Sequence, residues 1–450
     1  MGFKIVNNIL EKYNEQAGVT DVIIPDGVIE IGARAFSGCK YLKSINLPNS
    51  VTEIGRGAFS DCYALKRINI PDSVTQLGAY AFSHCKNLEE VTLSNNQKSI
   101  EEFTFDSCIK LKDIIIPDSV IKIAKRAFSY CEGLSKISLP NSIVKIGDFA
   151  FLYCKSIEEV VLPENLIEIE FGVFSFCKGL KIVVFPKYVS KIDSFAFEEC
   201  INLLNVDLPE SIKTIGNCAF ANCQKLESVD LKVGIEQIDN CAFECCESLK
   251  NICIPEGVKK LDFDVVYRCK DLNLILPSSL TEIKESIFAS NYIKNIDAPS
   301  HVLLSLLYST DYSLRLRKMA FQSLLKNYYD KQNQYTENDL IKLEEYIRRN
   351  RFELFPEAMK DSNLSDFMFK KIDKIYSPED IEKLFNLINA VGNEFYKISQ
   401  TEANAILLEY IHQNNLHIKP KELTLDDLED FDDNSKDDDE KGGKSKILKK

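Results

Sequence analysis

Cysteine has the greatest capacity for chemistry in this chain, because its thiolate binds metals, attacks electrophiles and forms disulfides. The sequence contains fifteen cysteines, and eleven of them recur at one constant spacing. These column cysteines are Cys39, Cys62, Cys85, Cys108, Cys131, Cys154, Cys177, Cys200, Cys223, Cys246 and Cys269. A thiol that repeats at one place in a structural unit is expected to line the interior as a small apolar side chain. We therefore interpret the column as a buried ladder of reduced thiols.

Four cysteines lie outside this column, namely Cys218, Cys241, Cys245 and Cys253. Cys218 and Cys241 share a register, so they should stack on adjacent repeats. A zinc site requires three or four convergent ligands, and the CxxC or histidine spacing that provides them is absent. We expect these four to be incidental surface thiols, with no metal and no cofactor.

The remaining candidates for catalysis are few. The four histidines are His84, His301, His412 and His417. No two have the spacing of zinc ligands, and none lies beside a nucleophile motif. The segment KGGKS is similar to part of a phosphate-binding loop, but the first glycine of that motif would fall at Asp438 in an acidic run. No glycine-rich dinucleotide fingerprint is present either, so we expect a protein that is not an enzyme.

The elements that position these cysteines are set by a sequence repeat of constant length. One unit reads PNSVTEIGRGAFSDCYALKRINI, residues 48–70. A phenylalanine column keeps the same register, at Phe36, Phe59, Phe82, Phe105, Phe128, Phe151, Phe174, Phe197, Phe220, Phe243 and Phe288, with Val266 as the one substitution. About twelve units lie within residues 25–299. A fixed period of this length indicates a solenoid in which each coil covers the apolar face of the next.

Each unit should contain two short strands and a turn. The residues before each proline alternate apolar and polar, as in Ile45-Asn46-Leu47, which is typical of a half-buried strand. A second short strand fits residues 51–54. The AFxxC segment is too short for a full helix, so we predict a helical or 3₁₀ turn that directs Phe and Cys inward.

The unit PDSVIKIAKRAFSYCEGLSKISL, which starts at Pro117, resembles the BspA-like class of leucine-rich repeats. That resemblance implies a solenoid of short parallel strands on a curved sheet. It also implies adhesion or protein binding on cell surfaces, although the class has intracellular members of unknown role. The segment ILEKYNEQAGVTDVIIP, from Ile9, resembles the divergent capping unit that precedes such arrays.

We predict four parts of the chain. Residues 1–24 form an N-terminal cap, residues 25–299 the solenoid, residues 300–416 an all-α domain, and residues 417–450 a disordered acidic and basic tail. In the α domain, Thr336 with Asp339 and Ser377 with Asp380 fit capping boxes that start helices. This part resembles the helical, roughly ankyrin-like regions that accompany the repeat in some bacterial proteins. We expect it to cap the last coil, with a second binding surface as an alternative.

Composition limits the partners. The formal net charge is -13 and no basic cluster stands out, which argues against nucleic acid and anionic membranes. No apolar run is long enough for a membrane span. The N-terminus, MGFKIVNNILEKYNEQ, lacks a secretory signal pattern. These features predict a cytoplasmic protein, with the cell surface, reached by an unrecognised export route, as the alternative.

The expected binding surface is the outward face of the strand before each proline. Most units place polar residues there, but the middle units place β-branched ones in a candidate apolar patch: Ile115, Val161, Ile182 and Val184. Asp207 and Asp230 flank it with negative charge. An exposed apolar patch often marks an interaction site. The alternatives are that β-branched residues merely suit a strand, or that a loop or the helical region covers them.

We therefore predict a non-enzymatic scaffold that binds a protein partner, with a cell-surface adhesin as the alternative function. The partner's identity and the oligomeric state stay open.

Overall fold

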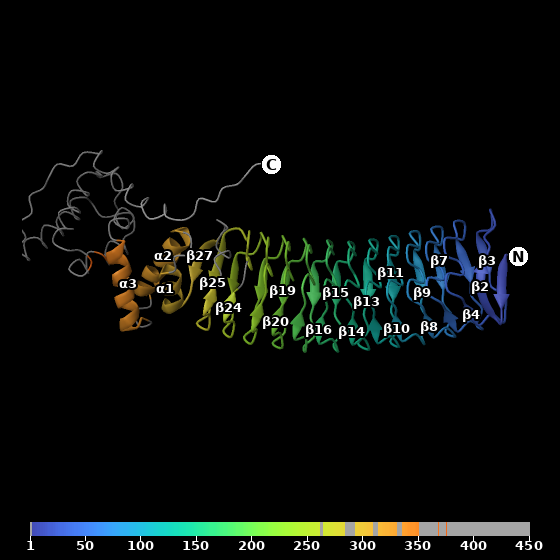
Figure 1. The fold of residues 1–450 in the computed structure, drawn as a ribbon, viewed down its shortest axis with the longest axis horizontal. Helices are drawn as coiled ribbons and strands as arrows, with labels where there is room; N and C mark the ends of the chain where they lie inside the picture. The colour runs from blue at the N-terminus through green and yellow to red at the C-terminus, as the bar shows by residue number, and fades with distance from the viewer. Residues whose placement is uncertain are drawn as a thin grey trace, which may run out of the picture. The chain divides into compact units, whose positions relative to one another are not determined.

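The computed structural model describes residues 2–261, 264–283, 293–308, 314–330 and 335–350, together with Met368 and Ile375. The chain divides into two compact units. The first comprises Met1–Val302 with Ser309–Met319, and the second comprises Leu303–Tyr308 with Ala320–Lys450. The strands β1 to β27 all belong to the first unit, where they stack coil upon coil as predicted (Figure 1).

One stack of parallel strands forms what we call the strand face. Its members are β3 (Asp21–Ile23), β5 (Ser44–Asn46), β7 (Arg67–Asn69), β9 (Glu90–Thr92), β11 (Asp113–Ile115), β13 (Lys136–Ser138), β15 (Glu159–Val161), β17 (Ile182–Val184), β19 (Asn205–Asp207), β21 (Ser228–Asp230), β23 (Asn251–Cys253), β25 (Leu272–Ile275) and β27 (Ile293–Asp297). In each three-residue strand the middle side chain points inward and the outer two point to solvent. Sheet partners such as Ile45 and Ile68 lie one repeat apart, so the repeat period is the register of the sheet.

A second stack of two-residue strands follows each turn. Its members are β4 (Glu30–Ile31), β6 (Glu53–Ile54), β8 (Gln76–Leu77), β10 (Ser99–Ile100), β12 (Lys122–Ile123), β14 (Lys145–Ile146), β16 (Glu168–Ile169), β18 (Lys191–Ile192), β20 (Thr214–Ile215), β22 (Gln237–Ile238), β24 (Lys260–Leu261) and β26 (Glu282–Ile283). The predicted strand over residues 51–54 is therefore shorter. Val51 is buried, but its N–H donates to the carbonyl of Pro48, so it closes a turn instead of pairing with a neighbouring coil.

The core is a stack of aromatic rings. From Phe36 to Phe243 the ten phenylalanines of the column are fully buried. Successive ring centroids lie 5.0–5.6 Å apart, and the interplanar angles are 18° or less. Each ring covers apolar surface of the next, and such pairs add stabilisation beyond the burial itself. Phe288 lies outside the described residues.

The AFxxC segment consists of single hydrogen-bonded turns. The N–H of Ala58 donates to Gly55 and that of Cys62 to Phe59, which are the i to i−3 bonds of a 3₁₀ turn. Residues with positive φ interrupt these turns, such as Tyr80 (62°) and His84 (61°), so no continuous helix forms. Both the predicted turn and the inward direction of Phe and Cys are confirmed.

The column cysteines do more than fill space. Ten of them donate from Sγ to the carbonyl oxygen of a phenylalanine 26 residues earlier, at 3.1–3.3 Å. The carbonyl of Phe36, for example, accepts from the N–H of Cys39 in its own coil and from the thiol of Cys62 in the next. Since a carbonyl oxygen has two lone pairs, the thiol satisfies the second and links adjacent coils.

The first coil is covered by an antiparallel hairpin of β1 (Phe3–Val6) and β2 (Ile9–Tyr13). β2 then pairs in parallel with β4. Leu10 is fully buried, and the ring of Tyr13 packs against Phe36 in a tilted arrangement, with the ring centroids 5.0 Å apart and an interplanar angle of 30°. Tyr13 therefore starts the aromatic stack while Phe3 packs on its other side at 5.4 Å. The hairpin shields the end of the stack from water.

Three helices with described bounds follow the solenoid within residues 300–350: α1 (Ser300–Tyr308), α2 (Leu314–Asp330) and α3 (Glu337–Arg349). The predicted capping box at α3 is confirmed, because the Thr336 side chain accepts from the Asp339 N–H and Asp339 accepts from the Thr336 N–H. Leu343 and Ile347 form the buried side of α3. The predicted helix start at Ser377 and the tail lie outside the described residues. Among the helices described, none has the length and apolar character needed to cross a membrane.

Replacing Phe128 by Ala should lower the free energy of unfolding by about 3–5 kcal/mol, since it leaves a cavity between two stacked rings. Urea denaturation followed by circular dichroism measures the change. Tyr188→Ala is the control, because that ring is 63% exposed and its loss should cost less than about 0.5 kcal/mol. Equal losses in the two variants would contradict a stability that depends on the ring stack.

Candidate functional site

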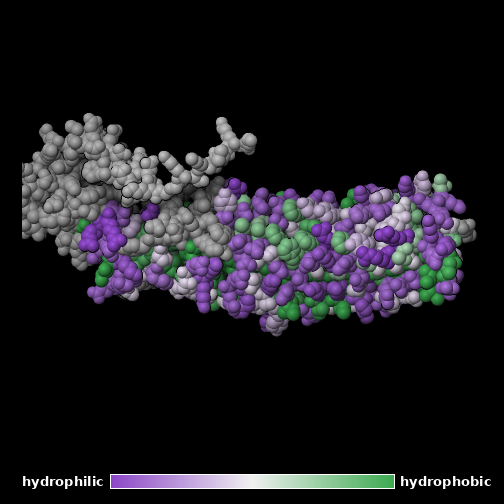
Figure 2. Space-filling model, in the orientation of Figure 1, coloured by the Kyte–Doolittle hydropathy of each residue, from purple (hydrophilic) through white to green (hydrophobic). Residues whose placement is uncertain are grey.

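The four residues of the predicted apolar patch all point outward from the strand face. Ile115 is 80% exposed, Val161 55%, Ile182 48% and Val184 45%. Their inward neighbours, such as Ile114 and Val160, are buried, as the alternation requires. The surface of the solenoid seen in Figure 2 is largely hydrophilic, with hydrophobic residues gathered in smaller areas.

The sheet register divides these four residues into two groups. Val161 pairs with Val184, and Glu159 with Ile182, so three of the apolar residues are neighbours on β15 and β17. The register partner of Ile115 is Ser138 on β13, which separates it from Val161. The predicted patch is thus one apolar cluster and one isolated isoleucine.

A surface groove brings together one residue from each of the two groups. It has a volume of about 1170 Å³ and lies over β9, β11, β13 and β15. Ile115 and Val161 line it on either side of Ser138, whereas Ile182 and Val184 are outside it. The small side chain of Ser138 lies between these two exposed aliphatic side chains on the floor of the groove.

The groove also carries negative charge that sequence reasoning did not assign to the site. Glu90, Asp113 and Glu159 line it from the first outward position of their strands. Among the residues that line the groove, Lys136 is the only Lys or Arg. The sequence does indicate that these acids point outward, because each stands at the start of a strand that ends in Thr92, Ile115 or Val161. Only the sheet register shows that the three acids lie together.

Asp207 and Asp230, predicted as the flanking acidic face, are register partners on β19 and β21. Both bind one cation, Lys232, with Nζ–Oδ distances of 3.1 Å to Asp207 and 2.5 Å to Asp230. Hydrogen bonds to Asp230 and then Asp207 raise the pKa of Lys232. Lys232 occupies a position where most units have proline, so this departure from the repeat supplies a positive charge that partly offsets the two aspartates.

The cysteines fall into the two predicted classes of position. All eleven column thiols are buried, and burial raises the pKa of thiols such as Cys131 and Cys177. Cys253 is exposed on the strand face, while Cys218, Cys241 and Cys245 are partly buried.

The two described histidines make polar contacts with residues of the solenoid. The Nδ1 atom of His84 bonds the hydroxyl of Ser83 at 2.9 Å, and its Nε2 lies 3.8 Å from Asp106. His301 bonds the carbonyl of Ser278. These are local polar contacts of the coils. His412 and His417 lie outside the described residues.

The repeat unit matches one protein family along most of the chain. The model of the BspA type leucine rich repeat region matches residues 7–134, 98–227, 190–311 and 215–338. The chain belongs to this family. Leucine-rich repeats are a scaffold type of architecture that generally serves protein interaction or cell surfaces. The comparison with curated proteins gave no match.

Solved structures of bacterial leucine-rich repeat proteins are similar to this chain. A leucine-rich repeat protein from Bacteroides ovatus has 30% identity and a TM-score of 0.56, covering 66% of this chain and 82% of its own. A leucine rich cell surface protein from Faecalibacterium prausnitzii has 27% identity and a TM-score of 0.47, with coverage of 71% and 95%. The T. pallidum leucine rich repeat protein has 27% identity and a TM-score of 0.35, with coverage of 45% and 86%.

A thiol reagent should distinguish the two classes of cysteine in the native protein. Cys253 should react first and Cys218, Cys241 and Cys245 more slowly, whereas the eleven column thiols should react only after denaturation, because the folded chain excludes the reagent. Colorimetric titration with a disulfide reagent counts them. Cys253→Ser should remove the fast phase. Reaction of more than four thiols in the native state would show that the ladder is accessible.

Proposed function

We propose that this protein is a non-enzymatic scaffold that binds a protein partner through its strand face, with the groove over β9 to β15 as the main contact. The observation that carries the proposal is the groove itself. It combines two exposed aliphatic side chains, Ile115 and Val161, with a rim of carboxylates on a sheet of fixed register. Protein interfaces are typically built from an apolar centre and a polar rim.

The charge and dimensions of the groove favour a particular partner. Glu90, Asp113 and Glu159 against Lys136 suit Lys or Arg side chains, which would flank an apolar residue seated between Ile115 and Val161. Adjacent coils are separated by about 4.8 Å, so four coils span roughly 14 Å. An extended peptide covers that distance in four or five residues at about 3.3 Å each. We therefore propose an extended basic and apolar segment of a protein as the ligand.

The solenoid lowers the cost of binding such a segment. The groove residues stand on strands whose backbone bonds and inward side chains are already fixed, so little ordering is required on this side. Ile115 and Val161 expose apolar surface to water in the free protein, and covering them returns about 25 cal/mol for each Å² buried.

Substitution of Ile115 and Val161 by Lys should weaken peptide binding at least tenfold, because it removes the apolar centre and places positive charge against a basic ligand. Peptides would first be selected from a random phage library against the full chain. Fluorescence anisotropy would then measure their dissociation constants. The matched control is Ile23→Lys, which changes a 72% exposed isoleucine at the same strand position of β3 outside the groove.

The selected peptides should be rich in Lys and Arg around an aliphatic or aromatic residue, and their binding should weaken with added salt. Val184→Lys should have a smaller effect than Val161→Lys, since Val184 lies beside the groove. Equal losses from the Ile23 and groove variants, or selection of acidic peptides, would refute the groove as the binding site.

We further propose that the protein works in a reducing, cytoplasmic compartment, which is supported by fifteen cysteines that are all free thiols. Protease treatment of intact source cells, followed by mass spectrometry, tests this. Repeat peptides should appear only after lysis, in parallel with a cytosolic control protein. Their release from intact cells, with the control retained, would instead favour the alternative function of a surface adhesin.

A further inference from the structure

Two of the cysteines outside the buried column are direct neighbours on adjacent coils. Cys218 and Cys241 lie one repeat apart, at a position where other coils carry residues such as Tyr80 or Phe195. Both have left-handed backbone, with φ of 52° and 55°. The N–H of Cys218 donates to the carbonyl of Asn240 at 2.9 Å, so the coil-to-coil bonds hold the two residues side by side.

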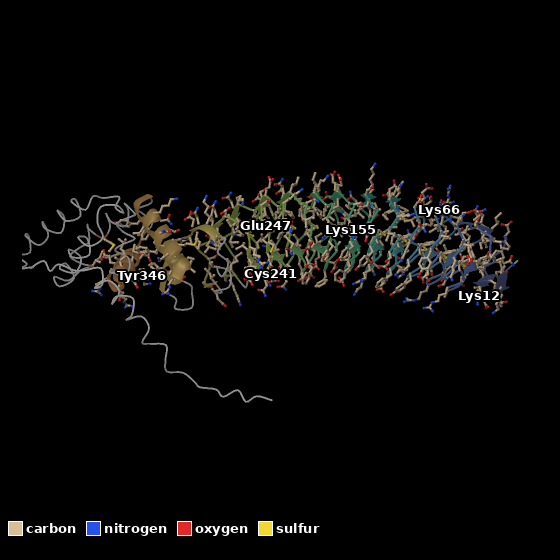
Figure 3. The ribbon with its side chains drawn as sticks, turned by 90° about the horizontal axis from the view of Figure 1, so that it is seen from above. Lys12, Lys66, Lys155, Cys241, Glu247 and Tyr346 are labelled. Atoms are coloured by element: carbon tan, nitrogen blue, oxygen red, sulfur yellow. The ribbon has the colours of Figure 1, made fainter. Side chains whose placement is uncertain are left out.

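A carboxylate completes the group. Glu244 follows Cys241 by one turn, and its N–H donates to the Cys241 carbonyl at 3.0 Å. That turn brings the Glu244 side chain back towards the thiols. The two Sγ atoms and a Glu244 carboxylate oxygen all lie within 4.8 Å of one another, and all three residues are partly buried. Figure 3 labels Cys241 among the side chains of this part of the solenoid.

The residue equivalent to Glu244 on the preceding coil is Ala221, one repeat earlier in the sequence. Alanine has no polar side chain to pair with Glu244. One coil earlier again the same position is Glu198, whose carboxylate accepts a hydrogen bond from Ser175 at 3.0 Å. The turn positions of these coils therefore carry two acids around a small residue, beside two thiols.

The surroundings are negative. Burial, followed by the charges of Glu198 and Glu244, raises the pKa of Cys218. Burial, a hydrogen bond with Glu244 and the charge of Glu244 raise the pKa of Cys241. Burial and then Glu244 also raise the pKa of Asp264, on the next coil. The charged groups that act on these three residues are acidic, so a cation would be stabilised among them.

Two thiolates and a carboxylate are a suitable donor set for zinc. Thiolate sulfur selects zinc over magnesium and calcium, which prefer sites made of oxygen atoms. In a tetrahedral zinc site, Zn–S bonds of about 2.3 Å and a Zn–O bond of about 2.1 Å place the donors roughly 3.6–3.8 Å apart. The three donors already lie within 4.8 Å of one another, so zinc binding requires each pair to approach by about 1 Å at most.

We propose that Cys218, Cys241 and Glu244 form a binding site for one zinc ion, with water as the fourth ligand. Binding releases the proton of each thiol, so two thiolates and one carboxylate hold the dication. The ion links two adjacent coils through the two thiolates, and because two protons leave as the dication enters, the net charge of the three ligands and the ion equals that of the carboxylate alone. The site is separate from the strand-face groove and does not depend on the proposed partner.

Cobalt(II) is the probe that reports thiolate ligation directly. The full chain, freed of metal and kept reduced with a phosphine, should bind one cobalt ion and show a thiolate-to-cobalt charge-transfer band in the near ultraviolet. One equivalent of zinc should remove the band by displacement, since zinc prefers tetrahedral thiolate sites. Absence of the band at one equivalent of cobalt would overturn the proposal.

Matched variants locate the site. The double variant Cys218→Ser and Cys241→Ser should abolish the band, while Cys245→Ser with Cys253→Ser, which changes the other two thiols outside the column, should leave it intact. Glu244→Ala should weaken zinc affinity at least tenfold, measured by competition with a chromophoric chelator. Ala221 already occupies that position one coil earlier, so this variant is expected to fold, and circular dichroism checks it.

The opposite results are equally clear. Retention of the band in the Cys218 and Cys241 double variant would assign the metal to other ligands. Recovery of a Cys218–Cys241 disulfide from the reduced, cobalt-treated protein, in place of bound metal, would show that the pair is a redox couple and refute the zinc site.

Discussion

The structure depends on a nearly constant repeat length, 23 residues in most coils and 22 in the last ones, which places equivalent residues of successive coils directly on one another. At that period each described phenylalanine ring of the column lies against the ring of the preceding coil, and ten of the eleven column thiols donate to a phenylalanine carbonyl one coil earlier. The parallel strands on both sides keep the same register. A coil has no core of its own, so its stability comes from the interfaces with its two neighbours.

This constraint determines how surface sites arise. A residue on the solenoid has neighbours on its own coil and neighbours one repeat away in the sequence. A surface site therefore forms where adjacent units both differ from the consensus and place the new side chains next to each other. The strand-face groove arises where Ile115 and Val161 replace polar residues on either side of Ser138. The thiol and carboxylate group arises where two successive coils have cysteine at one turn position. Identical interiors therefore support surfaces that vary from coil to coil.

Charge follows the same rule. Lys232 stands where most units have proline and forms ion pairs with both Asp207 and Asp230. It therefore reduces the net negative charge of that section of the strand face. Around the groove, the lining residues include four acids, Glu90, Asp113, Glu158 and Glu159, and one lysine, Lys136. Near Cys241, burial and then the charge of Glu244 raise the pKa of Asp264. Each of the two candidate sites is thus surrounded by acidic residues. The sites differ in ligand chemistry, since one offers aliphatic surface and the other offers thiols.

The sequence by itself determined the solenoid, the inward Phe and Cys columns and the outward direction of the four patch residues. A periodic pattern indicates which residues share a face, because the direction of a side chain depends on its position within its own unit. It could not show that Ile182 and Val184 lie outside the groove, that Lys232 binds both aspartates, or that Glu244 joins two cysteines. Those facts depend on how far each side chain reaches towards the neighbouring coils and on the backbone path of each turn. Only the tertiary structure sets these, because contacts between coils involve atoms that are distant in the chain.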